Sequence, residues 1–326
     1  MIILSIIIPV YKVEKYIDGT LSSIYNQHTD ETMFEVIVVN DGTPDNSMAI
    51  VDKFKHSHTN LTVISQSNQG LSVARNEGLR VAQGKYIWFV DSDDKIEDNI
   101  LNKLLVIVKN ENSDILGFGL TRINEAGSFI CTESPFLKKK YYSLYGKMCS
   151  GKYLYHKINI GLVQRYVYCH SFLEKNSLSF YPGIWYEDEQ FSVRAFFFAK
   201  NVKIINLNIY RYLVRSNGNI MSSVSMKSVY DSETIIKSWH DFSKENALNY
   251  KDKAIFYDAI SEYCFYIYSF RKIGIPAYQN FMAKYGSYYR KLGLRSAIYS
   301  LSYLSRRKVL CVLAFLFIPS KLYKFY

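Results

Sequence analysis

The chain has 326 residues, of which 48% are hydrophobic, and this is enough apolar material for a sizeable core in one or two domains. Its five cysteines are scattered and form no CxxC pair, which argues against a disulfide framework and a structural zinc site and indicates a reducing compartment. The formal net charge of +11 comes entirely from residues 263–326, because residues 1–262 carry equal numbers of basic and acidic side chains.

The first 120 residues alternate apolar runs typical of strands with stretches typical of helices. The N-terminal run MIILSIIIPVYK has no basic start and no small-residue cleavage site, so it predicts a strand and not a signal peptide. The predicted strands are ILSIIIPVY from Ile3, Phe34–Asp41, Leu61–Gln66, YIWFV from Tyr86 and Ile115–Leu120, with helices near 14–27, 44–57, 71–83 and 96–109. Several of these strands are apolar on both faces, which predicts a mainly parallel sheet with helices on both sides.

Three signals mark the predicted helix ends. Thr43 before Pro44 is typical of an N-cap followed by proline at the first helical position. Asp94, with Glu97 three residues later, resembles a capping box. Gly84 is placed to close the third helix.

The pattern changes after residue 120. It weakens over about 121–180, which predicts irregular structure there, and a helix is expected to start near Glu187. One or two strands are predicted over Val202–Val214, and the chain beyond about 225 is mostly helical in pattern. We therefore expect an α/β domain over residues 1–220 and a helical region over residues 221–326.

Polar clusters follow three predicted strands, at the edge where open α/β sheets bind ligands. They are PVYK, NDGTPDNS and DSDD. A dinucleotide site needs GxGxxG after the first strand, and the residues found there argue against one. In DSDD, the carboxylates of Asp91, Asp93 and Asp94 would raise one another's pKa without a cation beside them. Oxygen ligands favour Mg²⁺ or Mn²⁺, and these ions also coordinate substrate phosphates. The alternative role of Asp94 is that of a helix cap.

Five motifs together resemble the family-2 glycosyltransferases with the GT-A fold. They are SIIIPVYKVEKYI, VIVVNDGTPDNS, NQGLSVARNEGL, YIWFVDSDD and YEDEQF, and the resemblance covers residues 1 to about 215. Each motif is weak alone, but five in order with ordinary spacing identify the chain as a member of that family. The resemblance implies transfer of a sugar from a nucleotide donor, usually a UDP-sugar, with inversion at the anomeric carbon.

The resemblance also implies which residues bind the nucleotide. Pro9 and Tyr11 would line the uracil pocket, and Asp41 would accept a hydrogen bond from the base unless it is only a turn residue before a glycine. Arg75 and Asn76 lie where the family contacts the nucleotide and the diphosphate. The alternative for Arg75 is an exposed position on a helix.

The same resemblance assigns the metal and diphosphate contacts. Asp91 would hold the ribose or belong to the metal shell, and Asp93 would be the main ligand of Mn²⁺ or Mg²⁺. In YRYLVRSNGN, Arg215 is the candidate for the diphosphate and Arg211 is the alternative.

Asp188 in WYEDEQF matches the base of the family, with Glu187 and Glu189 on either side. An inverting transfer needs one carboxylate to take the proton of the acceptor hydroxyl. The alternative is that these acids only suit the positive end of a helix dipole. Trp185 either stacks on an acceptor sugar or belongs to the core.

The C-terminal 64 residues carry eleven basic side chains, eleven tyrosines, no acid and the apolar run Val309–Ile318. This combination predicts binding to an anionic membrane surface, and ten apolar residues are too few to span a bilayer, which takes about 20. Nucleic acid is the rival partner of a basic tail, but a nucleic-acid groove has little use for the apolar run, so no nucleic acid is expected.

Two functional classes remain. The first is an inverting, metal-dependent glycosyltransferase, peripheral on the cytoplasmic face of a bacterial membrane, with a lipid-diphosphate-linked saccharide as acceptor in capsule, O-antigen or exopolysaccharide synthesis. The second is a non-catalytic nucleotide-sugar or polyanion-binding module of the same fold, which the intact carboxylates argue against. A processive synthase would need long transmembrane helices and a QxxRW motif, and the sequence shows neither.

Overall fold

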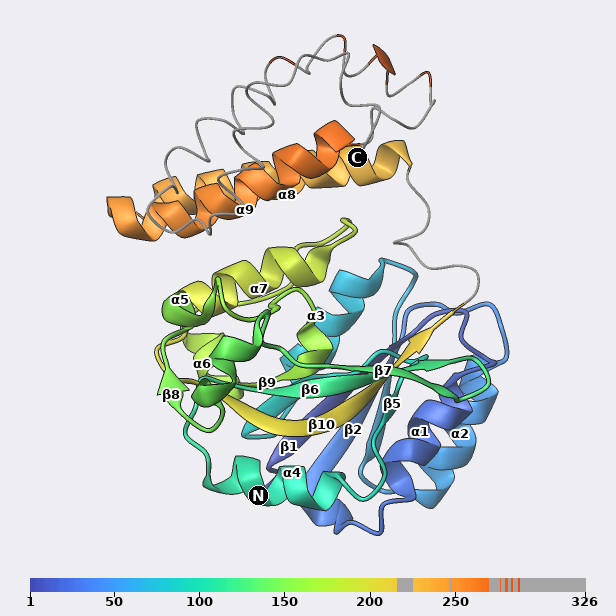
Figure 1. Cartoon of the computed structure of the whole chain (residues 1–326). Coiled ribbons are helices and arrows are strands. Elements are labelled where there is room, and N and C mark those ends of the chain that lie inside the picture. The colour runs from blue at the N-terminus through green and yellow to red at the C-terminus, as the bar shows by residue number, and fades with distance from the viewer. Residues whose placement is uncertain are drawn as a thin grey trace. The chain divides into compact units, whose positions relative to one another are not determined.

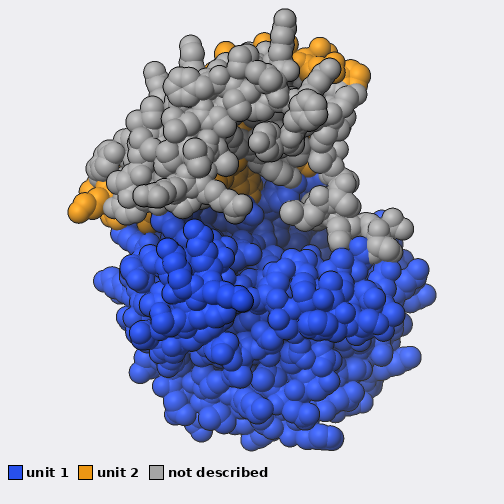
Figure 2. All heavy atoms as spheres, viewed as in Figure 1, with its two compact units in different colours: residues 1–219 blue, residues 220–326 orange. Residues whose placement is uncertain are grey.

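The computed structural model describes residues 1–215, 225–246 and 248–269, with five further single positions up to residue 287. The chain divides into two compact units, residues 1–219 and residues 220–326 (Figure 1; Figure 2, blue and orange).

The first unit is built around one mixed β-sheet with the strand order β3-β2-β1-β4-β9-β6-β10-β5 (Figure 1). Strands β1 to β4 pair in parallel, β9 runs antiparallel between β4 and β6, and β10 is parallel to β6. The short strands β7 and β8 pair with β6 and β10. The strands are β1 Leu4–Val10, β2 Phe34–Asn40, β3 Leu61–Ser65, β4 Tyr86–Phe89, β5 Lys95–Ile96, β6 Ile115–Asn124, β7 Phe129–Glu133, β8 Met148–Cys149, β9 Tyr166–Cys169 and β10 Val202–Val214.

Helices cover both faces of this sheet, so the predicted α/β class is confirmed. In β1, Ile6 and Ile8 join the core under α1, α2 and α4, whereas Ile7 joins the core under α3 and α5 to α7. This alternation explains why β1 is apolar at nearly every position. The helices are α1 Ile17–Tyr25, α2 Ser47–Ser57, α3 Leu71–Val81, α4 Leu101–Asn110, α5 Gly151–Leu154, α6 His170–Lys175 and α7 Glu187–Phe198, with 3-10 turns η1 Glu31–Met33, η2 Lys139–Leu144 and η3 Val163–Arg165.

Two predicted helix starts are wrong. The hydroxyl of Thr43 donates to Asp45, and it is Asp45 that accepts the N–H of Ser47 as α2 begins. After Asp94 the chain first forms β5, and α4 begins only at Leu101, so Asp94 caps no helix. A capping box is recognised from neighbouring residues alone. Here the carboxylate of Asp94 instead accepts hydrogen bonds from β10, which is distant in the sequence.

The role predicted for Gly84 is also wrong, because α3 already ends at Val81. A Cβ on Gly84 would lie 2.5 Å from the backbone nitrogen of Ser5, so the glycine is needed where the chain passes close to β1. The expectation of irregular structure over 121–180 is wrong for β9, which supplies a central strand of the sheet.

In the second unit, α8 Met226–Glu245 and α9 Tyr250–Ser269 pack on each other, so the predicted C-terminal helices are present in the described part of this unit. The ring of Trp239 meets Tyr263 at 5.1 Å between centroids, and Phe242 meets Phe256 at 4.9 Å. Among the described residues no helix is both long enough and apolar enough to cross a bilayer. The run Val309–Ile318 lies outside the residues that the structure describes.

Candidate active site

The strand order places the candidate site at the carboxyl edge of the sheet. β2 and β3 lie on one side of β1 and β4 lies on the other, so the direction of winding reverses at β1. Open α/β sheets bind ligands at such a reversal. The segments that leave β1, β2 and β4 here contain the three polar clusters of the sequence.

Three carboxylates gather in the turn after β4. One oxygen from each of Asp91, Asp93 and Asp94 lies within 4.8 Å of the others. Asp94 is buried and accepts hydrogen bonds of 2.7 Å from the N–H of Leu213 and from the hydroxyl of Tyr210. β10 therefore fixes the turn that presents the other two carboxylates.

The electrostatics of this cluster favour a cation. Burial raises the pKa of Asp94 well above its usual range, and the charges of Asp93 and Asp91 raise it further. Burial and the charge of Asp91 also raise the pKa of Asp93, although the ion pair with Arg215 opposes that shift. Carboxylates that repel one another so closely are the donor set that Mg²⁺ or Mn²⁺ accepts, so these side chains fit a divalent metal.

Arg75 links this cluster to the base candidate. Its guanidinium donates to Asp91 and to Glu187, each at 2.7 Å, and its side chain is 1% exposed. The alternative of an exposed helix position is therefore wrong. Burial alone would lower the pKa of Arg75, but the charges of Asp91 and Glu187 raise it, so the guanidinium stays charged.

Asp188 lies in the first turn of α7, between Glu187 and Glu189. Tyr186 before this turn has φ 62° and ψ 32°, a left-handed conformation that non-glycine residues seldom adopt. The Asp188 side chain is half-buried and accepts the N–H of Glu189 at 2.9 Å. Burial, followed by the charges of Glu187 and Glu189, raises the pKa of Asp188 well above its usual range. A raised pKa makes a carboxylate a stronger base.

Asp41 is buried at the end of β2 and shapes the loop that follows β3. Its carboxylate accepts the side-chain amide of Gln66 at 2.7 Å and the backbone N–H groups of Gln69 and Gly70 at 2.8 and 2.9 Å. Pro9 is buried in β1, and Tyr11 after it is 41% exposed. The uracil contacts of these three residues stay predictions.

The other predicted residues divide into two groups. The guanidinium of Arg215 pairs with Asp93 and stands 4.4 Å over the ring of Tyr16, so it belongs to the cluster. The side-chain amide of Asn76 instead exchanges hydrogen bonds of 2.9 and 2.8 Å with the backbone of Phe180. The alternative candidate Arg211 pairs with Glu97 and Asp98 instead of with one of the three carboxylates.

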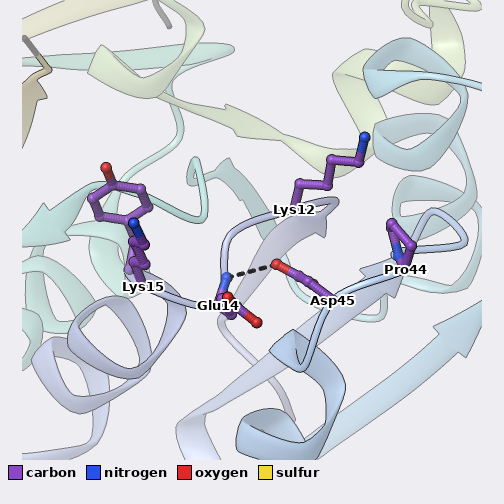
Figure 3. Close-up of a pocket in the computed structure, with 6 residues that line it drawn as sticks. Lys12, Glu14, Lys15, Pro44 and Asp45 are labelled. Atoms are coloured by element: carbon purple, nitrogen blue, oxygen red, sulfur yellow. Dashed lines mark hydrogen bonds between the residues drawn. The ribbon is translucent and has the colours of Figure 1, made fainter. Parts of the chain in front are cut away.

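An open pocket of about 400 Å³ adjoins the end of β1 (Figure 3). Its walls come from the segments after β1 and β2, which the 3.0 Å hydrogen bond from the N–H of Glu14 to Asp45 ties together. Tyr16 belongs both to this wall and to the contact with Arg215, so the pocket and the carboxylates share one edge. The lining residues are Lys12, Glu14, Lys15, Tyr16, Pro44 and Asp45.

Two residues of the site were missed by the sequence prediction. The side-chain amide of Gln164 donates to the Asp91 carboxylate. The hydroxyl of Tyr210 donates to Asp94 and accepts the N–H of Asp91 at 3.1 Å. The only signal for Tyr210 was its hydroxyl group within a predicted strand. Gln164 gave no signal, because it lies in the segment that was expected to be irregular.

Comparison with known proteins gives this arrangement a family context. The model of Glycosyl transferase family 2 matches residues 5–167. The "Uncharacterized glycosyltransferase EpsJ" of Bacillus subtilis (strain 168) is 32% identical to this chain over 70% of it and 65% of the relative. A poly(ribitol-phosphate) beta-glucosyltransferase of Bacillus spizizenii is 30% identical to this chain, and the match covers 78% of this chain and 39% of the relative. The chain thus spans less than two thirds of the length of these relatives.

Among solved structures, the crystal structure of S. aureus TarS 1–349 in complex with UDP-GlcNAc matches with a TM-score of 0.61. The identity is 22%, and the match covers 81% of each chain. At this identity the likeness establishes a common fold, so the predicted GT-A architecture is confirmed.

Proposed function

Since the chain belongs to glycosyl transferase family 2, we propose that it transfers a sugar from a nucleotide-diphosphate donor to a hydroxyl group of a saccharide acceptor. The observation that carries this proposal is the contact chain from Asp91 through Arg75 to Glu187, next to Asp188. One end of this chain is a carboxylate cluster that suits a metal ion and a diphosphate. The other end lies next to a carboxylate that suits general-base catalysis.

We expect the donor to be a UDP-sugar. The related TarS structure holds UDP-GlcNAc, which supports a uridine nucleotide in this fold. Pro9, Tyr11 and Asp41 stand at the ends of the two strands beside the reversal point, where the base would lie. Asp91 and Asp93 would hold Mn²⁺ or Mg²⁺, and the ion would offset the negative charge that develops on the departing diphosphate.

Asp188 would act on the acceptor. Its carboxylate takes the proton of the acceptor hydroxyl while the oxygen forms a bond to the anomeric carbon. The bond from that carbon to the diphosphate oxygen breaks on the opposite face, and the electron pair leaves with UDP. The product has the inverted configuration. Arg75 would keep Glu187, and with it the first turn of α7, in place during this step.

The proposed acceptor is a lipid-diphosphate-linked saccharide in capsule, O-antigen or exopolysaccharide synthesis. Support comes from residues 263–326, whose eleven basic side chains suit an anionic membrane, and we expect the enzyme on the inner face of the cell membrane. The Bacillus spizizenii relative is named for a poly(ribitol-phosphate) acceptor, which likewise contains phosphate groups.

Donor hydrolysis tests the proposal against a non-catalytic binding module. The purified chain is incubated with single UDP-sugars, with Mn²⁺ or with a chelator, and UDP release is measured. We expect release with at least one donor, and loss of that release when the chelator is present. A chain that binds UDP but releases none from any UDP-sugar, with or without a lipid-linked acceptor, is a binding module.

A further inference from the structure

A second basic surface lies within the first unit. Residues 134–173 contain no acidic residue and seven Lys or Arg residues. Five lysines of this segment are exposed, and large apolar side chains are exposed among them. We call the following residues the lysine–aromatic surface: Leu137, Lys138, Lys139, Lys140, Tyr142, Lys147, Met148, Lys152 and Tyr153.

The parts of this surface lie side by side although η2 and α5 are separate elements. The ammonium group of Lys157 stands 3.7 Å from the ring centroid of Tyr153 and 5.7 Å from that of Tyr141. The N–H of Leu137 donates to the carbonyl of Lys157 at 2.8 Å. Lys157 therefore brings the start of η2 next to α5, and Lys147 and Met148 lie in the short segment between these two elements.

Four lysines of this surface have no counter-charge in the described part of the chain. No described carboxylate forms an ion pair with Lys138, Lys139, Lys140 or Lys147, whereas Lys203 on β10 pairs with Glu111 at 2.8 Å. Four like charges without counter-charges repel one another, and an external anionic partner relieves that repulsion.

The apolar side chains decide which anionic partner fits. Leu137, Met148 and Tyr153 are 57%, 47% and 49% exposed, and Tyr142 is 42% exposed. A soluble polyanion would form ion pairs with the lysines but would not bury an exposed leucine or methionine. A lipid interface favours both kinds of side chain, because its phosphates bind the ammonium groups and its acyl boundary buries the apolar side chains.

We propose that the lysine–aromatic surface docks the first unit on an anionic lipid membrane. The lysines contact lipid phosphates, and Leu137, Tyr142, Met148 and Tyr153 enter the acyl boundary. This contact goes beyond the proposed function, since it requires neither sugar transfer nor residues 263–326, and it would give the first unit its own contact with the membrane.

Sedimentation with vesicles tests the proposal on the full chain, with no donor present. The vesicles contain phosphatidylcholine with one third phosphatidylglycerol. The variant K138Q/K139Q/K140Q is compared with K53Q/K55Q/K109Q, which removes the same charge from exposed lysines on α2 and α4. We expect the first variant to bind at least about tenfold more weakly, and the control to change by less than about twofold. Equal losses in the two variants overturn the proposal.

A second variant separates a membrane from a soluble polyanion. L137Q/M148Q keeps every charge, and we expect it to weaken vesicle binding severalfold while binding to heparin is unchanged. If it leaves vesicle binding unchanged, the surface recognises charge alone and the membrane proposal fails. Hydrogen exchange on vesicles should also protect peptides within 137–153 more than peptides within 47–57, and no added protection there contradicts the proposal. UDP release by these variants is measured separately, so failure of the docking proposal leaves the proposed function standing.

Discussion

Asp91 receives three contacts from distant parts of the chain, and they illustrate what the sequence can reveal at the scale of residues. Arg75 and Gln164 donate to its carboxylate, and its N–H donates to Tyr210. The cluster itself was predictable, because its three acids lie within four positions directly after a buried strand. Its partners were not, because they lie 16, 73 and 119 positions away and only the fold brings them together.

Substitution of Asp93 by asparagine should abolish transfer and metal-dependent UDP binding. The fold should survive, since Asp93 is half-buried and its neighbour Asp94 makes the contacts with β10. Calorimetry of UDP binding with and without Mn²⁺ measures the effect. The matched control is Asp98→Asn, an exposed acid on the same segment. Unchanged UDP and Mn²⁺ binding in Asp93→Asn would show that Asp93 is not a metal ligand.

Asp188→Asn should retain UDP-sugar affinity and lower kcat by at least about 100-fold, because a base contributes to the transition state and not to donor binding. Glu189→Gln, one position further along α7, is the control and should keep most of its kcat. An Asp188→Asn enzyme within tenfold of wild type would remove Asp188 from the mechanism.

The same carboxylate predicts a pH dependence. Asp188 must be ionised to accept a proton, and its pKa is raised, so kcat should fall as pH decreases through a midpoint above 3.8. The folded state also binds the Asp188 proton more tightly than the unfolded state, so its ionisation destabilises the fold at neutral pH. Asp188→Asn should therefore be the more stable protein at pH 7, with an advantage that shrinks as pH approaches 3.8.

At the scale of elements, strands with a continuous apolar run were predictable, even the four-residue β4, and short strands without such a run were not. β1 and β2 have seven residues each, and their apolar runs stand out from the flanking polar residues. β5 and β9 have two and four residues, too few for a period to show. Both are stabilised by pairing with strands that lie far away in the sequence, as in the pairing of Ile96 with Tyr210.

Arg75→Met should destabilise the protein by about 3 kcal/mol, because it leaves the Asp91 and Glu187 carboxylates without their buried counter-charge. Arg80→Met is the control on the same helix, where the side chain is 66% exposed, and it should cost less than about 1 kcal/mol. Urea unfolding measures both. The double variant R75M/E187Q should regain part of the loss, and equal costs for Arg75→Met and Arg80→Met contradict the assignment.

Asp45→Ala tests the link between the segments after β1 and β2. Burial alone would raise the pKa of Asp45, but hydrogen bonds from Ser47, Thr43 and the N–H of Glu14 lower it from 3.8 to about 2. The ionised carboxylate therefore stabilises the fold above pH 3.8, and this contribution is lost as pH falls toward 2. We expect a cost of about 1 kcal/mol at pH 7 and pH 4.5, and a smaller cost at pH 3, by urea unfolding. A cost that does not change with pH would exclude this ionic contribution.

At the scale of the whole molecule, the chain separates balanced charge in residues 1–262 from excess positive charge in residues 263–326. Composition alone revealed this division, because counting charges requires no knowledge of the fold. For the proposed enzyme with its lipid-bound acceptor, such a division would let residues 263–326 bind the membrane while residues 1–215 carry the candidate site.

Removal of residues 305–326 deletes five basic side chains and the run Val309–Ile318. At about 1 kcal/mol for each basic residue near an anionic surface, the truncated chain should sediment far less with anionic vesicles. It should still release UDP from the donor, because residues 1–215 contain all the candidate site residues. A truncated chain that is unfolded, or that binds vesicles as tightly at the same salt, contradicts the predicted anchor.

The bonds that hold Asp94 also set the order in which the protein matures during synthesis. Leu213, which donates its N–H to Asp94, follows it by 119 residues. At a translation rate of about 5–20 residues per second, Leu213 is synthesised roughly 6–24 seconds after the turn that follows β4. A nascent chain stalled before residue 213 would display all three carboxylates without the strand that holds them. The carboxylate cluster is therefore completed late, when β10 joins the sheet.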